Sequence, residues 1–139
     1  MIYKIKVITY LVIAVLLVRC EGGKKSDMFV EYYRTGGFVG LDDHLTIDKD
    51  GNAILERRDT KTEFKLDSDI INRLEILLND AEFTKLKKEY LPSRQGGDLI
   101  EYKITYSGHT IRMIDTAIPE ILQPILESLN QIIENGYQP

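Results

Sequence analysis

The apolar and polar residues at positions 28–66 alternate over short runs that are separated by turn residues. This pattern is typical of β-strands. We predict strands over 28–35 and 41–48, and the alternation of the second strand is broken once, at Asp43. The glycine-rich stretch "RTGGFVG" (34–40) separates the two strands and raises the question of whether it is only a tight turn.

Two hairpins are predicted from their turn residues. The Asp-Gly pair at 50–51 is a preferred two-residue hairpin turn, so residues 53–59 should return beside the preceding strand. Residues 62–66 are either a fourth strand or a continuation of the third after a kink. The clearest hairpin runs over 99–115, with alternating apolar residues on both sides of a Ser-Gly turn at 107–108.

Apolar residues at helical spacing predict two main helices. The first follows the N-cap cluster "DSD" (67–69), and a shorter helical turn after it ends at Pro92. The second is capped by Thr116 and ends at Gly136. The inward residues are expected to be Ile70, Ile71, Leu74, Leu77 and Leu78, then Phe83, Leu86 and Tyr90, and finally Ile121, Leu122, Ile125, Leu126, Leu129, Ile132 and Ile133.

These elements predict an α+β fold, in which an antiparallel sheet of four to five strands packs against two main helices. The fold is expected to occupy one domain, residues 28–139, and to be a monomer. Residues 21–27, "EGGKKSD", are expected to form a flexible linker before it.

Residues 1–20 have the pattern of an export signal, with a basic start and an apolar run at 7–18 before Cys20. The run is short for a membrane-spanning helix, which needs about 20 apolar residues. Cys20 stands where bacterial lipoproteins carry their lipid, although Arg19 occupies a position where a small residue is usual. We therefore expect an exported protein of the cell envelope, either membrane-anchored through lipidated Cys20 or an uncleaved segment, or secreted.

The net charge of the chain limits the classes of partner that are expected. The sequence has 18 basic and 22 acidic residues, and three of the basic ones lie within the first twenty positions: Lys4, Lys6 and Arg19. The remainder therefore carries a net charge of −7. Nucleic acid requires a basic face, so it is not expected as a partner. A single cysteine also excludes an intramolecular disulfide.

No residue set typical of catalysis is found, so we predict a protein that is not an enzyme and has no cofactor and no metal. His44 and His109 are far apart and belong to no known catalytic motif. The acids and histidine of "DDH" (42–44) either contact a metal ion or are solvated strand residues, and the second interpretation is favoured. "DKDGN" (48–52) lacks the spacing of a calcium-binding loop and favours a hairpin turn. The Arg-Arg pair at 57–58 is too short a basic run to indicate a site.

Several short motifs follow one another in a fixed order over about residues 29–133. They are Gly-Gly-Phe-x-Gly at 36–40, "F..L" at 83–86, Gly-Asp at 97–98 before the strand that carries Tyr102, and Pro-Glu-x-Leu at 119–122. This order resembles the emfourin-like family, small protein inhibitors of protealysin, a thermolysin-like metalloprotease. The resemblance implies a compact α+β inhibitor that blocks a protease cleft without being a substrate. The chain departs from the family in having an export segment.

The glycine-rich loop is the candidate interaction site. As a purely structural turn, it joins two strands. As a functional loop, it presents Phe38 or Val39 to a partner, and thermolysin-like sites, as the resemblance implies, favour a bulky apolar side chain next to the scissile bond. We predict inhibition of a thermolysin-like zinc metalloprotease through an interface consisting of Thr35, Gly36, Gly37, Phe38, Val39 and Gly40.

Two alternatives stay open. The glycine loop "SRQGGD" (93–98) is a second candidate surface, although a plain connection between helix and strand is the favoured interpretation. The competing function is that of a membrane-anchored surface lipoprotein whose domain is a non-catalytic protein-interaction module.

Overall fold

Within the described residues, seven strands form one sheet in the order β4-β3-β2-β1-β6-β7-β5. The computed structural model describes residues 28–94 and 96–136. The strands are β1 (Met28–Gly36), β2 (Leu41–Asp48), β3 (Asn52–Arg57), β4 (Thr60–Lys65), β5 (Glu89–Tyr90), β6 (Ile100–Tyr106) and β7 (His109–Ile114). The helices are α2 (Ser68–Asp80) and α3 (Gln123–Gly136).

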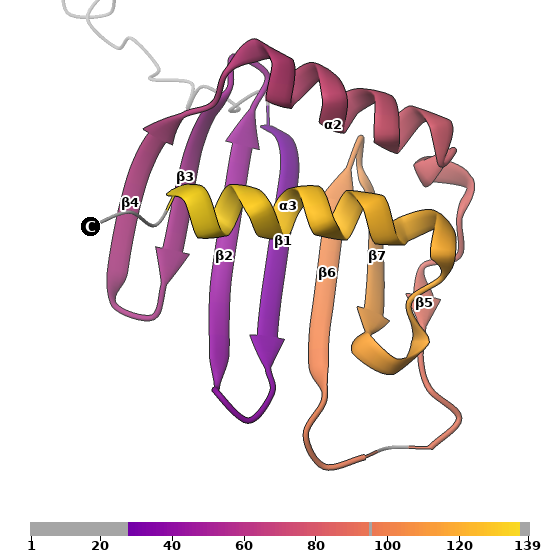
Figure 1. Cartoon of the computed structure of the whole chain (residues 1–139). Helices are drawn as coiled ribbons and strands as arrows, with labels where there is room; N and C mark the ends of the chain where they lie inside the picture. Colours follow the sequence, from indigo (N-terminus) through magenta and orange to yellow (C-terminus); the bar gives the residue numbers. More distant parts are fainter. Residues whose placement is uncertain (1–27, 95, 137–139) are drawn as a thin grey trace, which may run out of the picture.

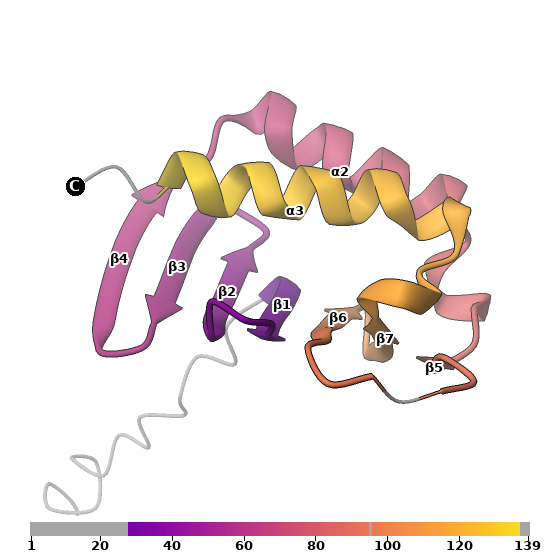
Figure 2. The ribbon, with the colours of Figure 1, turned by 60° about the horizontal axis from the view of Figure 1, so that its bottom comes forward.

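Figure 1 shows both helices crossing the sheet, and Figure 2 shows that they lie on the same face of it. Neighbouring strands are antiparallel, except that the short β5 pairs in parallel with β7. The first strand lies at the centre, because β1 pairs with β2 on one side and with β6 on the other. The strands of the N-terminal half thus share one sheet with the later hairpin.

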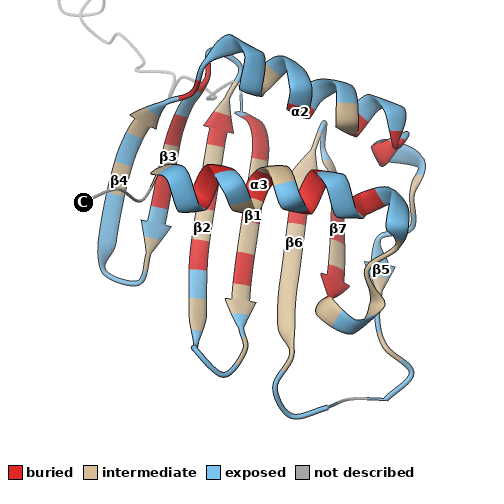
Figure 3. Ribbon diagram, viewed as in Figure 1, coloured by how far each residue is buried: buried red, intermediate tan, exposed pale blue. Residues whose placement is uncertain are grey.

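The core lies between the sheet and the helices. One row of buried residues crosses five strands, each member paired in register with the next: Leu55, Leu45, Tyr32, Ile104 and Ile111. Leu74 and Leu78 of α2 and Leu129 and Ile133 of α3 cover this side of the sheet and are fully buried. In Figure 3 the buried positions lie on the central strands and at intervals along α3. The alternating apolar residues of the strands and the apolar stripes of the two helices therefore pack together in one core.

The predicted hairpin between β2 and β3 forms, but its turn spans three residues, 49–51, instead of the expected Asp-Gly pair. Gly51 has a φ of 83°, a conformation that glycine adopts readily. The Asp48 carboxylate accepts hydrogen bonds from the backbone N–H groups of Asp50 and Asn52, at 2.9 and 2.8 Å. These bonds hold β2 and β3 in the register that places Leu45 opposite Leu55.

The predicted α+β class is confirmed, but the prediction of four to five strands was an undercount, because the sheet has seven. Residues 60–65 are a separate strand, β4, joined to β3 by a two-residue turn. This confirms the fourth-strand alternative, whereas β5 was not predicted, because its two residues are too few for an alternating pattern to show.

The segment after α2 also differs from the prediction. Instead of a short helical turn that carries Tyr90 inward, Phe83–Lys85 forms a single 3-10 turn, and Tyr90 belongs to β5. Glu82 has a left-handed backbone, with a φ of 47°, which ends the helical path. The last helix likewise starts later than expected, at Gln123, after two 3-10 segments.

The N-terminal predictions lie outside the described residues. They concern the signal segment 1–20 with Cys20 and the linker 21–27. Within the part of the chain that the structure describes, no helix has the length and apolar character needed to cross a membrane.

Replacing Leu78 by alanine should lower the free energy of unfolding by about 2 to 5 kcal/mol, because the side chain is fully buried under α2 and its removal leaves a cavity. The matched control is Ile76→Ala on the same helix, where the side chain is 58% exposed, and a change below about 1 kcal/mol is expected. Urea denaturation measures both. Equal losses for the two variants would contradict the core described above.

Candidate protein-interaction site

The tip of the β1–β2 hairpin, residues 37–40, presents two apolar side chains to solvent. Phe38 is 95% exposed, more than any other large apolar residue in the described part of the chain, and Val39 is 73% exposed. Thr35 and Gly36 of the predicted interface belong to the end of β1. The structure therefore keeps the six predicted residues together and places only two of their side chains, those of Phe38 and Val39, outside the fold.

The tip is closed by its own backbone. The Gly40 N–H donates a hydrogen bond of 2.9 Å to the Gly37 carbonyl, so residues 37–40 form a single tight turn. Gly37 and Gly40 have φ values of 71° and 63°, which a residue with a side chain rarely adopts. The glycines are thus required by the turn that displays Phe38.

A second loop lies against the tip. The Gly37 N–H donates to the carbonyl of Leu99 at 3.1 Å. A side chain at Gly36 would meet that same carbonyl at 2.6 Å, so only glycine allows the approach. Leu99 directly follows the second candidate surface, residues 93–98, of which Gln95 lies outside the described residues. The two glycine loops are therefore neighbours at one end of the sheet (Figure 1).

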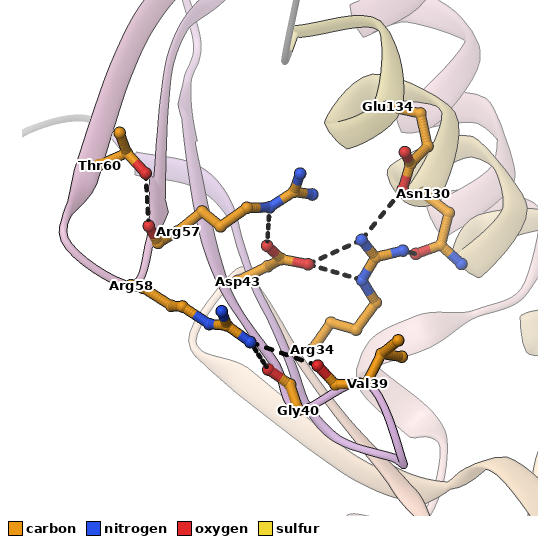
Figure 4. Close-up of polar contacts among 9 residues, drawn as sticks. All are labelled: Arg34, Val39, Gly40, Asp43, Arg57, Arg58, Thr60, Asn130 and Glu134. Carbon is orange, nitrogen blue, oxygen red and sulfur yellow. Dashed lines mark hydrogen bonds and ion pairs between the residues drawn. The ribbon is translucent and has the colours of Figure 1, made fainter.

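Arg58, in the turn between β3 and β4, holds the tip from the other side. Its Nη2 donates to the carbonyls of Gly40 at 2.9 Å and of Val39 at 3.3 Å (Figure 4). Arg58 has a φ of 51°, an unfavourable backbone conformation for a residue with a long side chain. The Arg-Arg pair gave no sign of a site as a basic run, but the structure shows that Arg58 contacts the backbone of the tip.

A hollow of about 620 Å³ opens between the tip and the β3–β4 turn. Its walls include Val39, Gly40 and Arg58, and its floor is made by charged residues of three neighbouring strands: Arg34, Asp43 and Arg57. Glu134 of α3 closes the back. Residues of the tip and the buried Arg34–Asp43 ion pair therefore line the same hollow.

Asp43 is the central charge of this floor. Its carboxylate is 1% exposed and accepts from Arg34 through Nε at 2.9 Å and Nη2 at 2.7 Å, and from Nε of Arg57 at 2.5 Å. These three residues are cross-strand neighbours on the helix-facing side of the sheet. A carboxylate buried between two guanidinium groups has its charge and its hydrogen-bonding capacity satisfied.

The network continues from the sheet to α3. Arg34 also donates to Asn130 Oδ1 and to Glu134 Oε1, each at 3.1 Å. The Tyr32 hydroxyl donates to the same Asn130 oxygen at 2.9 Å. Burial lowers the pKa of Arg34, but the hydrogen bonds to Asp43 and Glu134 outweigh burial and leave the pKa above its usual value. The charged form of Arg34 therefore joins three strands to the last helix.

The "DDH" segment does not act as one unit. Asp43 is buried, so its interpretation as a solvated strand residue was wrong, whereas Asp42 is exposed. His44 lies on the opposite, helix-free face, with its ring nitrogens 3.0 Å from Glu31 and 3.3 Å from Glu56. In the described residues, no group of three or more histidine, cysteine or acidic side chains is arranged to hold a metal ion.

His44 instead supports an aromatic stack. Its ring lies parallel to that of Tyr33 at a centroid distance of 4.0 Å. Burial and the hydrogen bond to Glu31 raise the pKa of Tyr33 to about 12. The neutral hydroxyl can therefore keep donating to Glu31, at 2.8 Å, over the physiological pH range.

A lysine side chain contacts oxygen atoms of the "DKDGN" turn. Lys65 Nζ donates to the Asp50 carbonyl and to Asn52 Oδ1. The ammonium group thus uses oxygen atoms that a calcium ion would need. His109 has a structural contact too, because its Nε2 lies 3.0 Å from the Leu86 carbonyl.

Comparison with known proteins gives no assignment. No protein-family model matches the chain, and no curated protein matches it significantly. Any role of the tip therefore depends on the tip's own geometry.

Replacing Asp43 by asparagine should lower the free energy of unfolding by about 3 kcal/mol or more, because the buried Arg34 and the partly buried Arg57 lose their shared anion. The neighbouring exposed Asp42→Asn is the control and should change stability by about 0.5 kcal/mol at most. Chemical denaturation of both variants decides the matter. Similar stabilities would show that the ion pairs contribute little.

Tyr32 should make the fold sensitive to alkali. Burial raises the pKa of its hydroxyl well above the usual value of 10.0, so its contribution to stability is present below pH 10 and is lost as the pH rises further. Above pH 10 the loss of stability should therefore be steeper for wild type than for Tyr32→Phe, with a difference that approaches about 1.4 kcal/mol per pH unit above pH 11. Denaturant titrations at several pH values measure the difference. Parallel curves for the two proteins would contradict it.

Proposed function

We propose that this protein inhibits a thermolysin-like zinc metalloprotease by inserting the tip of the β1–β2 hairpin into the protease cleft. The observation that carries the proposal is the 95% exposure of Phe38 on a closed turn. A fully exposed phenylalanine contributes nothing to its own core, and burial of such a side chain by a partner is favourable by about 1.5 to 3 kcal/mol.

The tip has the shape that insertion requires. It consists of only four residues, and it lies at the end of two long strands, β1 and β2 (Figure 1). Glycines flank the two apolar residues, so little besides Phe38 and Val39 hinders approach to the walls of a narrow cleft.

The tip is also held before any partner arrives. Leu99 fixes its first half through the Gly37 N–H, and Arg58 fixes its second half through two carbonyls. An ordered loop loses less conformational entropy on binding than a disordered one, so more of the contact energy is available for affinity. Preorganisation of this kind is a feature of tight protein inhibitors.

The resemblance to emfourin-like proteins supplies the class of target. Phe38 would occupy the pocket for the bulky apolar side chain next to the scissile bond. Export to the cell envelope, anchored through Cys20 or secreted, would place the inhibitor where exported proteases act. If no such protease responds, the same tip supports the alternative of a non-catalytic interaction module with another protein partner.

Phe38→Ala should weaken inhibition of a thermolysin-like protease by about 30-fold or more, since a central buried aromatic anchor typically contributes at least about 2 kcal/mol to binding. The measurement is residual protease activity against inhibitor concentration. Ile76→Ala, an exposed apolar residue on α2 at the other end of the sheet, is the matched control and should inhibit like wild type (Figure 1).

Both variants should melt at the wild-type temperature, because both side chains are exposed. Inhibition by Phe38→Ala that equals wild type would show that the tip is not the contact. Full protease activity with stoichiometric wild type would instead favour the interaction module.

A further inference from the structure

We propose that Arg58 locks the tip in a conformation that a protease can bind but cannot hydrolyse. The identity of the protease rests on the proposed function; the locking of the tip rests on the structure of the tip alone. Arg58 is a positioning residue in this proposal, because it acts through the backbone of Val39 and Gly40 and not on the protease.

The exposed sequence of the tip would suit a substrate. Phe38 is a bulky apolar side chain in an accessible loop, and small residues precede it. Hydrolysis of the Gly37–Phe38 bond would add water across the C–N bond and give a carboxylate on Gly37 and an amine on Phe38. A flexible loop of this composition would be expected to be cut.

The carbonyl of the Gly37–Phe38 bond is turned inward. It accepts the Gly40 N–H at 2.9 Å, while the N–H of Gly37 is bonded to Leu99 on the other side. Attack on a peptide carbon requires its carbonyl to lie in a precise geometry toward the groups that polarise it. The tip must therefore open before this bond is hydrolysed.

Arg58 opposes this opening. Its guanidinium holds the carbonyls of Val39 and Gly40, which must separate from Gly37 if the turn is to become extended. Its backbone has the positive φ of 51° that glycine would adopt without strain. An arginine at such a position is locally strained, and its side chain donates the hydrogen bonds that hold the tip.

Four proteins separate this role from a general effect on stability. Arg58→Gly relieves the backbone strain and removes the guanidinium, while Arg58→Met keeps the strain and the aliphatic stem but removes the donors. Arg58→Lys retains a donor. Arg73→Ala, at an exposed position of α2, is the matched control for loss of an arginine.

Each protein is incubated with thermolysin, with the protein in molar excess over the protease, and cleavage at the tip is followed by mass spectrometry. The melting temperature of each protein is measured separately by thermal denaturation. Wild type and Arg73→Ala should stay intact at the tip. Arg58→Gly and Arg58→Met should both be cut there about tenfold faster or more, as two lost hydrogen bonds to a charged donor permit. Arg58→Lys should be cut at an intermediate rate, and Arg58→Gly should melt no lower than wild type.

Equal cleavage rates for wild type, Arg58→Gly and Arg58→Met would overturn the proposal. Cleavage of Arg58→Gly alone would also overturn it, because backbone freedom and not the guanidinium would then be responsible. Residual thermolysin activity in the same reactions tests the proposed function separately: full activity with intact wild type rejects inhibition, while the comparison of cleavage rates still decides the role of Arg58.

Discussion

The buried carboxylate of Asp43 is the constraint on which the rest of the structure depends. It lies between Arg34 and Arg57, its two cross-strand neighbours, on the side of the sheet that faces the helices. An unpaired charge at this position would be strongly destabilising, so β1, β2 and β3 must keep their register. Through Arg34 the same charges reach Asn130 and fix α3 over the sheet. The apolar core and this polar end therefore specify one arrangement together.

That arrangement decides what the exposed end of the sheet can do. Arg57 directly precedes the β3–β4 turn, and its partner Asp43 lies on β2, separated from the tip by Leu41 and Asp42, so fixing the register of this pair also positions Arg58 relative to Gly40. The hydrogen bond from Arg58 is possible only because the two hairpins end side by side (Figure 4). The buried ion pairs of Asp43 and the exposed tip are thus coupled through the strand register, which sets the position of the exposed Arg58 side chain.

Much of this could be predicted from the sequence, because local periodicity determines which residues form strands and helices. The single break in alternation at Asp43 was visible, but its partners were not, since Arg34 and Arg57 become neighbours only through strand pairing. The two-residue β5 is too short for a periodic signal, and its pairing with β7 involves residues that are distant in the sequence. The glycine-rich tip was recognisable because its glycines are required locally, whereas the contribution of Arg58 depends on the tertiary fold.

The helix-free face of the sheet contrasts with the tip. A row of mostly polar residues in register crosses all seven strands on that face: Lys61, Glu56, His44, Tyr33, Lys103, Arg112 and Glu89. Charged residues of this row form ion pairs with residues of opposite charge in the row or next to it. Arg112, for example, contacts Glu101 at 2.6 Å, and this hydrogen bond lowers the pKa of that carboxyl. Such a face is stable in water without a partner. Phe38 differs from this face, because its large apolar side chain is almost entirely exposed to water.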